Sequence, residues 1–490
     1  MSSIRKLILH FSHFVGGGTI SLLLGLITFP ILTRILTRED YGMLGLVTNS
    51  VAIAVALAKA GLSDGIIRFY RDYANTPERL ALFTSNVVTR GIILAVVVVS
   101  AYILVLPVVA SWTHVNQRYT TCFLIMALYL LVRPLNIIVL NYLRALGKTL
   151  FFTFTNILTK AIGIALALAL LLWVIGELYG YFLGIAIAEV GAMIFLFRWL
   201  FSNYRFSLTL VSGSLTVNLI RFGFPLLLSE LSYLLLSYAD RYMIVAFHGE
   251  DVLGLYTVGY NIPSYINDLV MFSLSYAVVP IYTDLFVRDG KKATEAFLTR
   301  SMKYYLLGMI PLCVGYAAIA RDLLVILASN KYAEAATFSP IVLVGLAFMG
   351  MNSMLYAGLY LNKKSGLILT TMLTAVAINI LANLVLLPRY GALGAAISTL
   401  IACIASSLLF FVLTRKTLRV NVSLSSTSFY FAISAAMYLL LSAIDTAHPW
   451  LNVVVKIPLG MFITATAVLW REPEMREQSL TLVRRFWTRR

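Results

Sequence analysis

The chain has 490 residues, of which 60% are hydrophobic and only 12% are charged. Soluble domains carry about 25% charged residues, so this composition excludes an ordinary soluble domain and indicates an apolar surrounding medium. The formal net charge is +17, but the 38 Lys and Arg residues are scattered between apolar runs. Nucleic-acid-binding proteins gather basic residues into a patch or arm, so we expect no nucleic-acid partner and place this charge beside anionic membrane lipids.

Long apolar segments follow one another along the whole chain. A membrane-spanning helix needs roughly 20 such residues, so the sequence predicts an all-α integral membrane protein with about 14 transmembrane helices. The predicted spans are residues 12–33, 41–64, 87–110, 119–140, 150–173, 178–199, 222–247, 253–280, 304–327, 338–361, 366–387, 391–413, 428–446 and 451–470. Cys122, Cys313 and Cys403 each stand alone in an apolar run, so we expect no disulfide, metal site or bound cofactor.

Basic residues alternate between the two sets of loops that these spans define. Counted together with basic residues near span ends, the set that includes both termini holds 27 Lys and Arg residues and the other set holds 7. Lys59, Arg133, Lys160 and Arg241 are assigned to the spans. Cytoplasmic loops carry the excess of Lys and Arg, so both termini are expected in the cytoplasm.

Two short segments recur at one spacing. RILTREDYGMLG at 34–45 has a counterpart in GEDVLGLY at 249–256, and NYLRALG at 141–147 has one in LYLNKKSG at 359–366. Both pairs indicate a repeat of roughly 210 residues, or six spans, and an even number of spans makes such a repeat parallel, with its axis along the membrane normal.

This repeat divides the chain into three parts. We expect an N-terminal lobe over residues 1–205 and a C-terminal lobe over 206–415, related by a parallel pseudo-two-fold axis. Residues 416–490 then add spans 13 and 14 and a basic cytoplasmic tail. The loops are short and contain no phosphate-binding Gly-rich motif, so the sequence predicts no catalytic site and no enzyme.

Charges inside spans are the candidate functional residues, because a buried charge normally faces a cavity or a partner. Lys160 lies near the middle of its predicted span, with Arg133 and Lys59 nearer the cytoplasm. Together with Arg241 they predict a cationic substrate path suited to an anionic pyrophosphate. In the alternative interpretation, Lys59 extends to the interface and Arg133 bonds the backbone that Pro134 leaves free.

The acidic residues inside spans have two interpretations. Glu189, Glu230 and Asp268 fall near mid-span, where they either bind a coupling proton or sodium ion or pair with the basic residues. Asp240 has the same two interpretations, ion coupling or pairing, and lies with Arg241 toward the outer end of a span. Neighbouring helical residues do not face each other, so we expect these two to clamp other helices or act in gating and not to pair together. Four tyrosines are candidates for stacking on sugar rings: Tyr233, Tyr238, Tyr260 and Tyr265.

Three segments carry a family resemblance. ILTRILTREDYGMLGLV, SYADRYMIVAFHGEDVLGLYTVGYNIP and RDLLVILASNKYAEAATFSPIVLVGLAFMGMNSM resemble bacterial polysaccharide and O-antigen flippases. These flippases belong to the multidrug/oligosaccharidyl-lipid/polysaccharide exporter superfamily. The resemblance implies a V-shaped pair of six-helix lobes around a central cavity.

The resemblance also implies a function. A flippase of this kind moves a polyprenyl-pyrophosphate-linked oligosaccharide across the bacterial inner membrane by alternating access, for polysaccharide, lipopolysaccharide O-antigen or capsule biosynthesis. Its expected partners are that lipid-linked oligosaccharide, membrane lipids, a glycan polymerase and glycosyltransferases. The first span departs from the peptidoglycan-precursor branch, because it is rich in Gly and Thr where that branch has an arginine-lined helix. A cation-coupled drug exporter and a non-transporting assembly partner of a glycan polymerase are the alternative functions.

Overall fold

The computed structural model describes residues 3–113, 116–472 and 476–477, and every regular element in these ranges is helical. The long helices are α1 (Ser3–Ile35), α2 (Arg38–Lys59), α4 (Pro77–Thr113), α5 (Thr120–Ala145), α6 (Thr149–Ala169), α7 (Leu178–Asn203), α8 (Gly213–Arg288), α9 (Gly290–Leu327), α10 (Ser339–Leu355), α12 (Ser365–Thr414), α13 (Leu424–Ser442) and α14 (Pro449–Arg471). The shorter elements are α3 (Leu62–Tyr73), η1 (Gln117–Tyr119), η2 (Leu170–Val174), η3 (Asn330–Thr337) and α11 (Ala357–Leu361). The predicted basic tail beyond residue 477 lies outside the described residues.

Twelve helical segments in the described part of the chain are long and apolar enough to cross a membrane. Two of the underlying helices, α8 and α12, bend at Gly249 (φ 81°) and Gly391 (φ 55°), which are the only interior positions where each leaves helical geometry. Glycine adopts such positive φ values without the clash of a Cβ atom. Each bend leaves two arms that exceed the roughly 20 residues a span needs, so fourteen crossing arms result. The prediction of an all-α membrane protein with about 14 transmembrane helices is confirmed.

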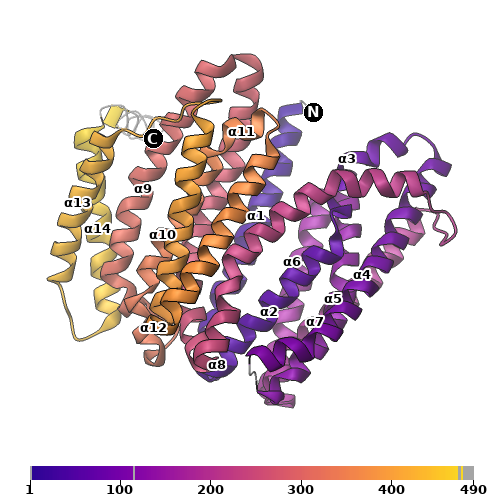
Figure 1. The fold of residues 1–490 in the computed structure, drawn as a ribbon, viewed down its shortest axis with the longest axis horizontal. Helices are drawn as coiled ribbons and strands as arrows, with labels where there is room; N and C mark the ends of the chain where they lie inside the picture. Colours follow the sequence, from indigo (N-terminus) through magenta and orange to yellow (C-terminus); the bar gives the residue numbers. More distant parts are fainter. Residues whose placement is uncertain (1–2, 114–115, 473–475, 478–490) are drawn as a thin grey trace, which may run out of the picture.

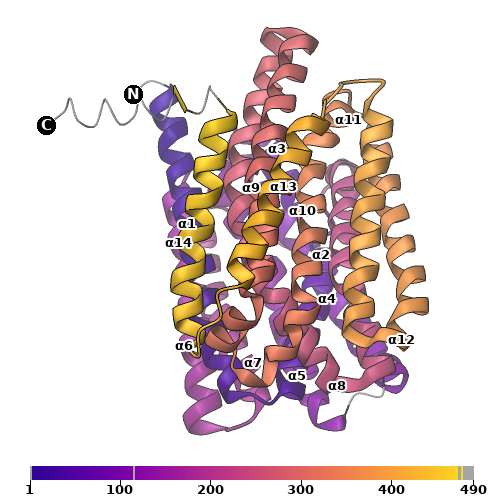
Figure 2. The ribbon, with the colours of Figure 1, turned by 90° about the vertical axis from the view of Figure 1, so that its left-hand side faces the viewer.

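All these helices run between two faces of the molecule. Helix α1 begins and α14 ends on the same face, which we call the terminal face, at the top of Figure 1 and Figure 2. The bends of α8 and α12 and the start of α2 lie at the other face, which we call the opposite face (Figure 1). Successive loops therefore lie on alternate faces, as the count of Lys and Arg residues in the sequence assumed.

The helices form two bundles that meet near the opposite face and diverge toward the terminal face (Figure 1). One bundle contains α2–α7, and the other contains α9, α10 and α12–α14. The first arm of α8 begins beside the α2–α7 bundle, where Leu219 packs in a core with Leu62 and Tyr142. It ends beside α12, where His248 Nε2 lies 2.7 Å from the Leu387 carbonyl oxygen. This single arm therefore joins both bundles.

Local sequence explains how α2 begins and ends. The Thr37 hydroxyl accepts a hydrogen bond from the Asp40 backbone N–H at 3.1 Å, which caps the first turn. Ala60 and Gly61 adopt positive φ and stop the helix. The sequence predicted one span over 41–64, but α2 ends at Lys59 and a separate helix, α3, follows. Only one face of α3 is apolar, and its Ile66 and Tyr70 bury that face against α4 and α5.

The division into lobes at 1–205 and 206–415, related by a parallel two-fold axis, stays a prediction. The side of the membrane on which each loop lies can be tested directly. We expect reporter fusions after residues 251, 330 and 448 to read one side of the membrane and fusions after 146, 291 and 364 to read the other, with the second group cytoplasmic. Phosphatase and fluorescent-protein reporters at each site provide the measurement. Two consecutive fusions along the chain that report the same side would contradict the fourteen-arm topology.

Candidate functional site

A cavity of about 880 Å³ is lined by α1, α2, α5, α6, α7 and both arms of α8. Its lining runs from Arg144, in the last turn of α5 at the terminal face, to Tyr41, in the first turn of α2 at the opposite face. The α1 side is built from small residues, including Gly17, Ser21 and Gly25. The cavity therefore spans most of the membrane-crossing length of the protein.

Four basic residues line this cavity, together with a single carboxylate, Glu189. The basic residues are Arg133, Arg144, Lys160 and Arg241. Arg144 was assigned to a cytoplasmic loop from the sequence, but α5 continues far enough to carry it into the lining, and its guanidinium stands 5.5 Å from the centre of the Phe152 ring. The excess of cations gives the cavity a positive character that suits an anionic ligand.

Arg133 lies in the middle of α5 and pairs with Glu189 in the middle of α7. Arg133 Nη1 donates to Glu189 Oε1 at 2.9 Å, and Asn136 Nδ2 donates to the other carboxylate oxygen at 2.6 Å. Glu189 is only 6% exposed, so these two donors compensate for the removal of its charge from water. Of the two interpretations for Glu189, the geometry shows the ion pair.

Lys160 differs from Arg133 because no carboxylate in the described residues pairs with it. Its Nζ donates to the Ser21 backbone carbonyl of α1 at 2.7 Å, and the side chain is exposed to the cavity. Glu189 and Glu230, the partners considered from the sequence, are bound to Arg133 and Lys59 instead. Lys160 is thus a mid-helix cation held in place by a neutral group.

Asp240 and Arg241 do pair with each other, and this corrects the expectation from the sequence. The Arg241 side chain folds back along α8 so that Nη1 reaches Asp240 Oδ1 at 3.2 Å and also the Ser237 carbonyl. Asp240 is fully buried and accepts further hydrogen bonds from Tyr256 and from Thr399 of α12. The length of the arginine side chain overcomes the separation of neighbouring positions on a helix.

Lys59 is not part of the cavity lining, which corrects its predicted place in the substrate path. Its Nζ donates to both carboxylate oxygens of Glu230, at 2.6 and 2.9 Å, and so ties the end of α2 to the first arm of α8. Nearby, Gly61 and Gly223 pack so closely that a Cβ added to Gly223 would lie 2.3 Å from the Gly61 carbonyl oxygen. The pair therefore belongs to a helix-packing contact.

Two predicted sets of residues remain. Asp268 is exposed, does not line the cavity and makes no hydrogen bond or ion pair within the described residues. Of the four tyrosines, Tyr238, Tyr260 and Tyr265 line the cavity and Tyr233 does not. The Arg241 guanidinium stands 4.4 Å from the centre of the Tyr260 ring and 5.1 Å from that of Tyr238.

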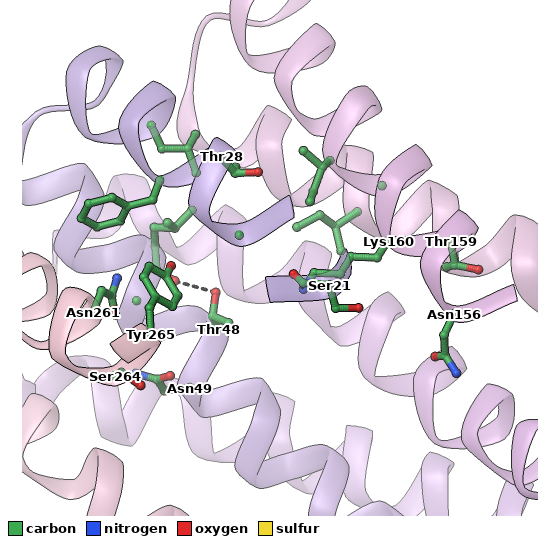
Figure 3. A pocket seen from close by; sticks show the side chains of 18 of the residues that line it. Ser21, Thr28, Thr48, Asn49, Asn156, Thr159, Lys160, Asn261, Ser264 and Tyr265 are labelled. Atoms are coloured by element: carbon green, nitrogen blue, oxygen red, sulfur yellow. Dashed lines mark hydrogen bonds between the residues drawn. The ribbon is translucent and has the colours of Figure 1, made fainter. Parts of the chain in front are cut away.

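Uncharged polar side chains form a second group in the lining, and of these only Tyr265 was a candidate from the sequence. Figure 3 shows Thr48, Asn49, Asn261, Ser264 and Tyr265 gathered on one side of the cavity and Lys160 on the other. We call these five residues the neutral pole. They come from α2 and from the second arm of α8.

The cavity is closed at the opposite face by the two segments that the sequence identified as repeats. Arg38 Nε lies 3.4 Å from Asp251, and Arg38 Nη2 lies 3.7 Å from Glu334 of η3. Beneath these ion pairs, a Cβ added to Gly254 would lie only 1.8 Å from the Arg38 carbonyl oxygen, so the backbones are in direct contact. We call the contact of residues 34–45 with residues 249–256 and 326–334 the closure.

Further polar contacts surround the closure. Arg118 Nη2 lies 3.1 Å from Glu39 and 3.3 Å from Asp40. The Tyr119 hydroxyl donates to Asp40 at 2.9 Å, and burial raises the pKa of Tyr119, which keeps that donor proton in place. Two backbone carbonyls also accept hydrogen bonds here, since Arg34 Nη2 donates to Ile326 at 2.6 Å and Lys331 Nζ donates to Leu36 at 2.5 Å. The structure is therefore closed at the opposite face.

Gly254→Ala tests the closure. The new Cβ forces α2 and α8 apart, and overpacking of this kind costs about 1–3 kcal/mol. The reporter is a thiol introduced by Leu44→Cys in a background without the three native cysteines. We expect this thiol to react several-fold faster with an impermeant reagent added at the opposite face when Gly254→Ala is present than when it is absent. Gly308→Ala is the matched control, since its Cβ meets nothing within 4 Å. Equal labelling rates in all three proteins would show that this contact does not seal the cavity.

The Arg133–Glu189 pair makes a second prediction. Arg133→Gln leaves the Glu189 carboxylate buried without its cation, so we expect a loss of about 1–3 kcal/mol of stability. The double variant Arg133→Gln/Glu189→Gln should recover part of that loss, which thermal unfolding in detergent measures as a non-additive double-mutant cycle. Additive effects would mean that the two groups do not stabilise each other.

The membrane-crossing helical arms, the polar cavity and the closure at one face belong to a fold that is also seen in solved structures of transport proteins. Among the solved structures that share this fold are a flippase and a multidrug resistance transporter. The lipid II flippase MurJ in an inward closed conformation aligns with a TM-score of 0.78 at 14% identity, over 96% of this chain and 99% of that chain. An inward-facing multidrug resistance MATE family transporter of the MOP superfamily aligns with a TM-score of 0.68 at 15% identity, over 81% of this chain and 94% of that chain.

The sequence identifies the family. Residues 11–286 match the family described as polysaccharide biosynthesis protein, and this match covers more than half of the chain. The chain therefore belongs to the polysaccharide biosynthesis protein family and has the fold of MOP-superfamily transporters. A similar protein is the uncharacterized membrane protein MJ1068 of Methanocaldococcus jannaschii, which is 24% identical over 391 residues, or 74% of this chain and 75% of that protein.

Proposed function

We propose that this protein flips a polyprenyl-pyrophosphate-linked oligosaccharide from the cytoplasmic to the outer leaflet of a bacterial inner membrane, for the assembly of a cell-surface polysaccharide such as O-antigen or capsule. The observation that carries the proposal is the cationic cavity, in which Lys160 has no carboxylate partner among the described residues. Family membership and the fold shared with the lipid II flippase support it. The positive-inside rule places the terminal face in the cytoplasm.

The charge of the cavity favours this function over a cation-coupled drug exporter. A cavity that binds cationic drugs is expected to present acidic groups, whereas this lining has four basic residues and one acidic residue. Arg133 and Arg241 are paired with Glu189 and Asp240, and Arg144 lies at the terminal-face end of the cavity. Lys160 is therefore the cation at mid-helix depth that no carboxylate among the described residues neutralises. A phosphate at this position would gain a charge-assisted hydrogen bond in a site only partly open to water.

The mechanism follows from the closure. In the conformation described here, a polar head group enters the cavity from the terminal face while its lipid tail stays in the bilayer. Transfer of a charged head group through hydrocarbon unaided is prohibitive, and the cavity cations lower that barrier. Release then requires the closure to separate and the bundles to approach each other at the terminal face. A membrane-bound glycan polymerase and glycosyltransferases are the proposed partners before and after this step.

Coupling to a proton or sodium gradient stays a prediction. Three of the four acidic residues considered for it have basic partners: Glu189 with Arg133, Glu230 with Lys59 and Asp240 with Arg241. Asp268 is the fourth, and it makes no ion pair in the part of the chain that the structure describes. It is therefore the residue we assign to ion coupling.

Lys160→Gln tests the proposed function. Loss of a hydrogen bond to a charged group costs about 1.5–3 kcal/mol, so we expect the affinity for geranyl pyrophosphate to fall roughly 10- to 100-fold, with export of surface glycan lost. Lys160→Arg should retain more function than Lys160→Gln, because it keeps the charge.

Lys148→Gln is the matched control. Lys148 precedes the same helix, but it stacks on Trp199 outside the cavity, with Nζ 5.1 Å from the ring centre. We expect normal binding and export from this variant. Full glycan export by Lys160→Gln at normal expression would refute the role of Lys160.

A further inference from the structure

The neutral pole contains hydrogen-bonding groups that the protein itself does not use. Asn49, Ser264 and Tyr265 make no side-chain hydrogen bond with any described residue, although all three line the cavity. Asn261 donates to the Tyr41 hydroxyl at 3.0 Å through Nδ2. Polar groups between packed helices are normally satisfied, so unused donors and acceptors in a cavity indicate water or a ligand there.

The chemistry of this pole differs from that of the Lys160 side. None of the five residues is charged, and Arg241, which also lines the cavity, is occupied by Asp240 and by the Tyr238 and Tyr260 rings. Amide and hydroxyl groups both donate and accept hydrogen bonds, as sugar hydroxyls do. A phosphate would find no counter-charge among these five side chains, whereas a hydroxyl-rich uncharged group finds matching partners.

An aromatic surface completes the pole. The Tyr265 ring packs edge-on against Phe29, with 5.8 Å between ring centres. On the α1 side, Gly25 stands next to this ring, and even an added Cβ there would be 3.9 Å from Tyr265 Cε1. The absence of a side chain at Gly25 therefore leaves room beside the ring. Aromatic rings bordered by a few polar groups are typical of small-molecule sites that fix one orientation of the ligand.

We propose that the neutral pole is a subsite for an uncharged sugar, which it binds while Lys160 holds the pyrophosphate of the same molecule. The two groups lie on different sides of one cavity (Figure 3), as the covalent order of lipid, pyrophosphate and sugar requires. This inference rests on the proposed function and deepens it, because it assigns the choice of glycan to Asn49, Asn261, Ser264 and Tyr265. A site built to bind hydroxyl groups discriminates against a ligand that lacks them.

Two probes separate the subsite from the phosphate site: geranyl pyrophosphate and geranyl pyrophosphate linked to N-acetylglucosamine. Calorimetry on the purified full chain in detergent gives both affinities and their ratio. We expect the wild-type protein to bind the sugar-bearing probe about tenfold more tightly, as two or more added hydrogen bonds provide. The double variant Asn49→Ala/Ser264→Ala should bring this ratio close to one, without weakening geranyl pyrophosphate.

Asn156→Ala is the matched control, because Asn156 is an amide of the same cavity on the Lys160 side (Figure 3). We expect it to leave the ratio unchanged, and Lys160→Gln to weaken both probes equally. A wild-type ratio of one, or a ratio that persists in the double variant, would overturn the sugar subsite. Unchanged binding of both probes by Lys160→Gln would instead overturn the proposed function. The ratio of the two probe affinities would then still test the sugar subsite.

Discussion

The organisation of this protein depends on how it accommodates charge within the membrane. An ionised group in hydrocarbon is so costly that it must be paired or face water. Lys59, Arg133 and Arg241 are each paired with a carboxylate, and these pairs connect α2 to α8, connect α5 to α7 and fix a side chain on α8. Lys160 is stabilised instead by the Ser21 carbonyl and by the cavity. The same constraint therefore produces ion pairs at these three positions and a cation that faces the cavity at the fourth.

The second arrangement that shapes the molecule is the contact between the two repeated segments. Residues 34–45 and 249–256 meet at the closure, where Gly42 and Gly254 allow the backbones to touch and Arg38 and Asp251 add charge. The first arm of α8 connects this contact to the terminal face, since it packs on α3 at one end and on α12 at the other. Separation of the closure must therefore be accompanied by a change in how α8 packs on both bundles.

The sequence was sufficient to predict the membrane-spanning arms, because bilayer thickness sets their length and hydropathy reports it directly. It did not reveal the continuity of α8 and α12, since the bends at Gly249 and Gly391 read as ordinary loop glycines. Partners such as Lys59–Glu230 depend on the rotation of one helix against another, which hydropathy does not encode. The pairing of Asp240 with Arg241 was missed because the spacing rule ignores the reach of a long side chain. Of the neutral pole, Tyr265 was a candidate from the sequence, but the other four residues were missed because Thr, Asn and Ser side chains on different helices form no sequence motif.

The stability of the closure also depends on the solution outside it. Arg38, Arg118, Glu39, Asp251 and Glu334 are partly or largely exposed, so their attraction acts through solvent. Mobile ions screen such pairs over a Debye length of about 8 Å at physiological ionic strength and about 30 Å in 0.01 M salt. A dilute medium at the opposite face thus strengthens the closure, and a saline one weakens it. The salinity of the surroundings therefore contributes to the stability of this closed arrangement.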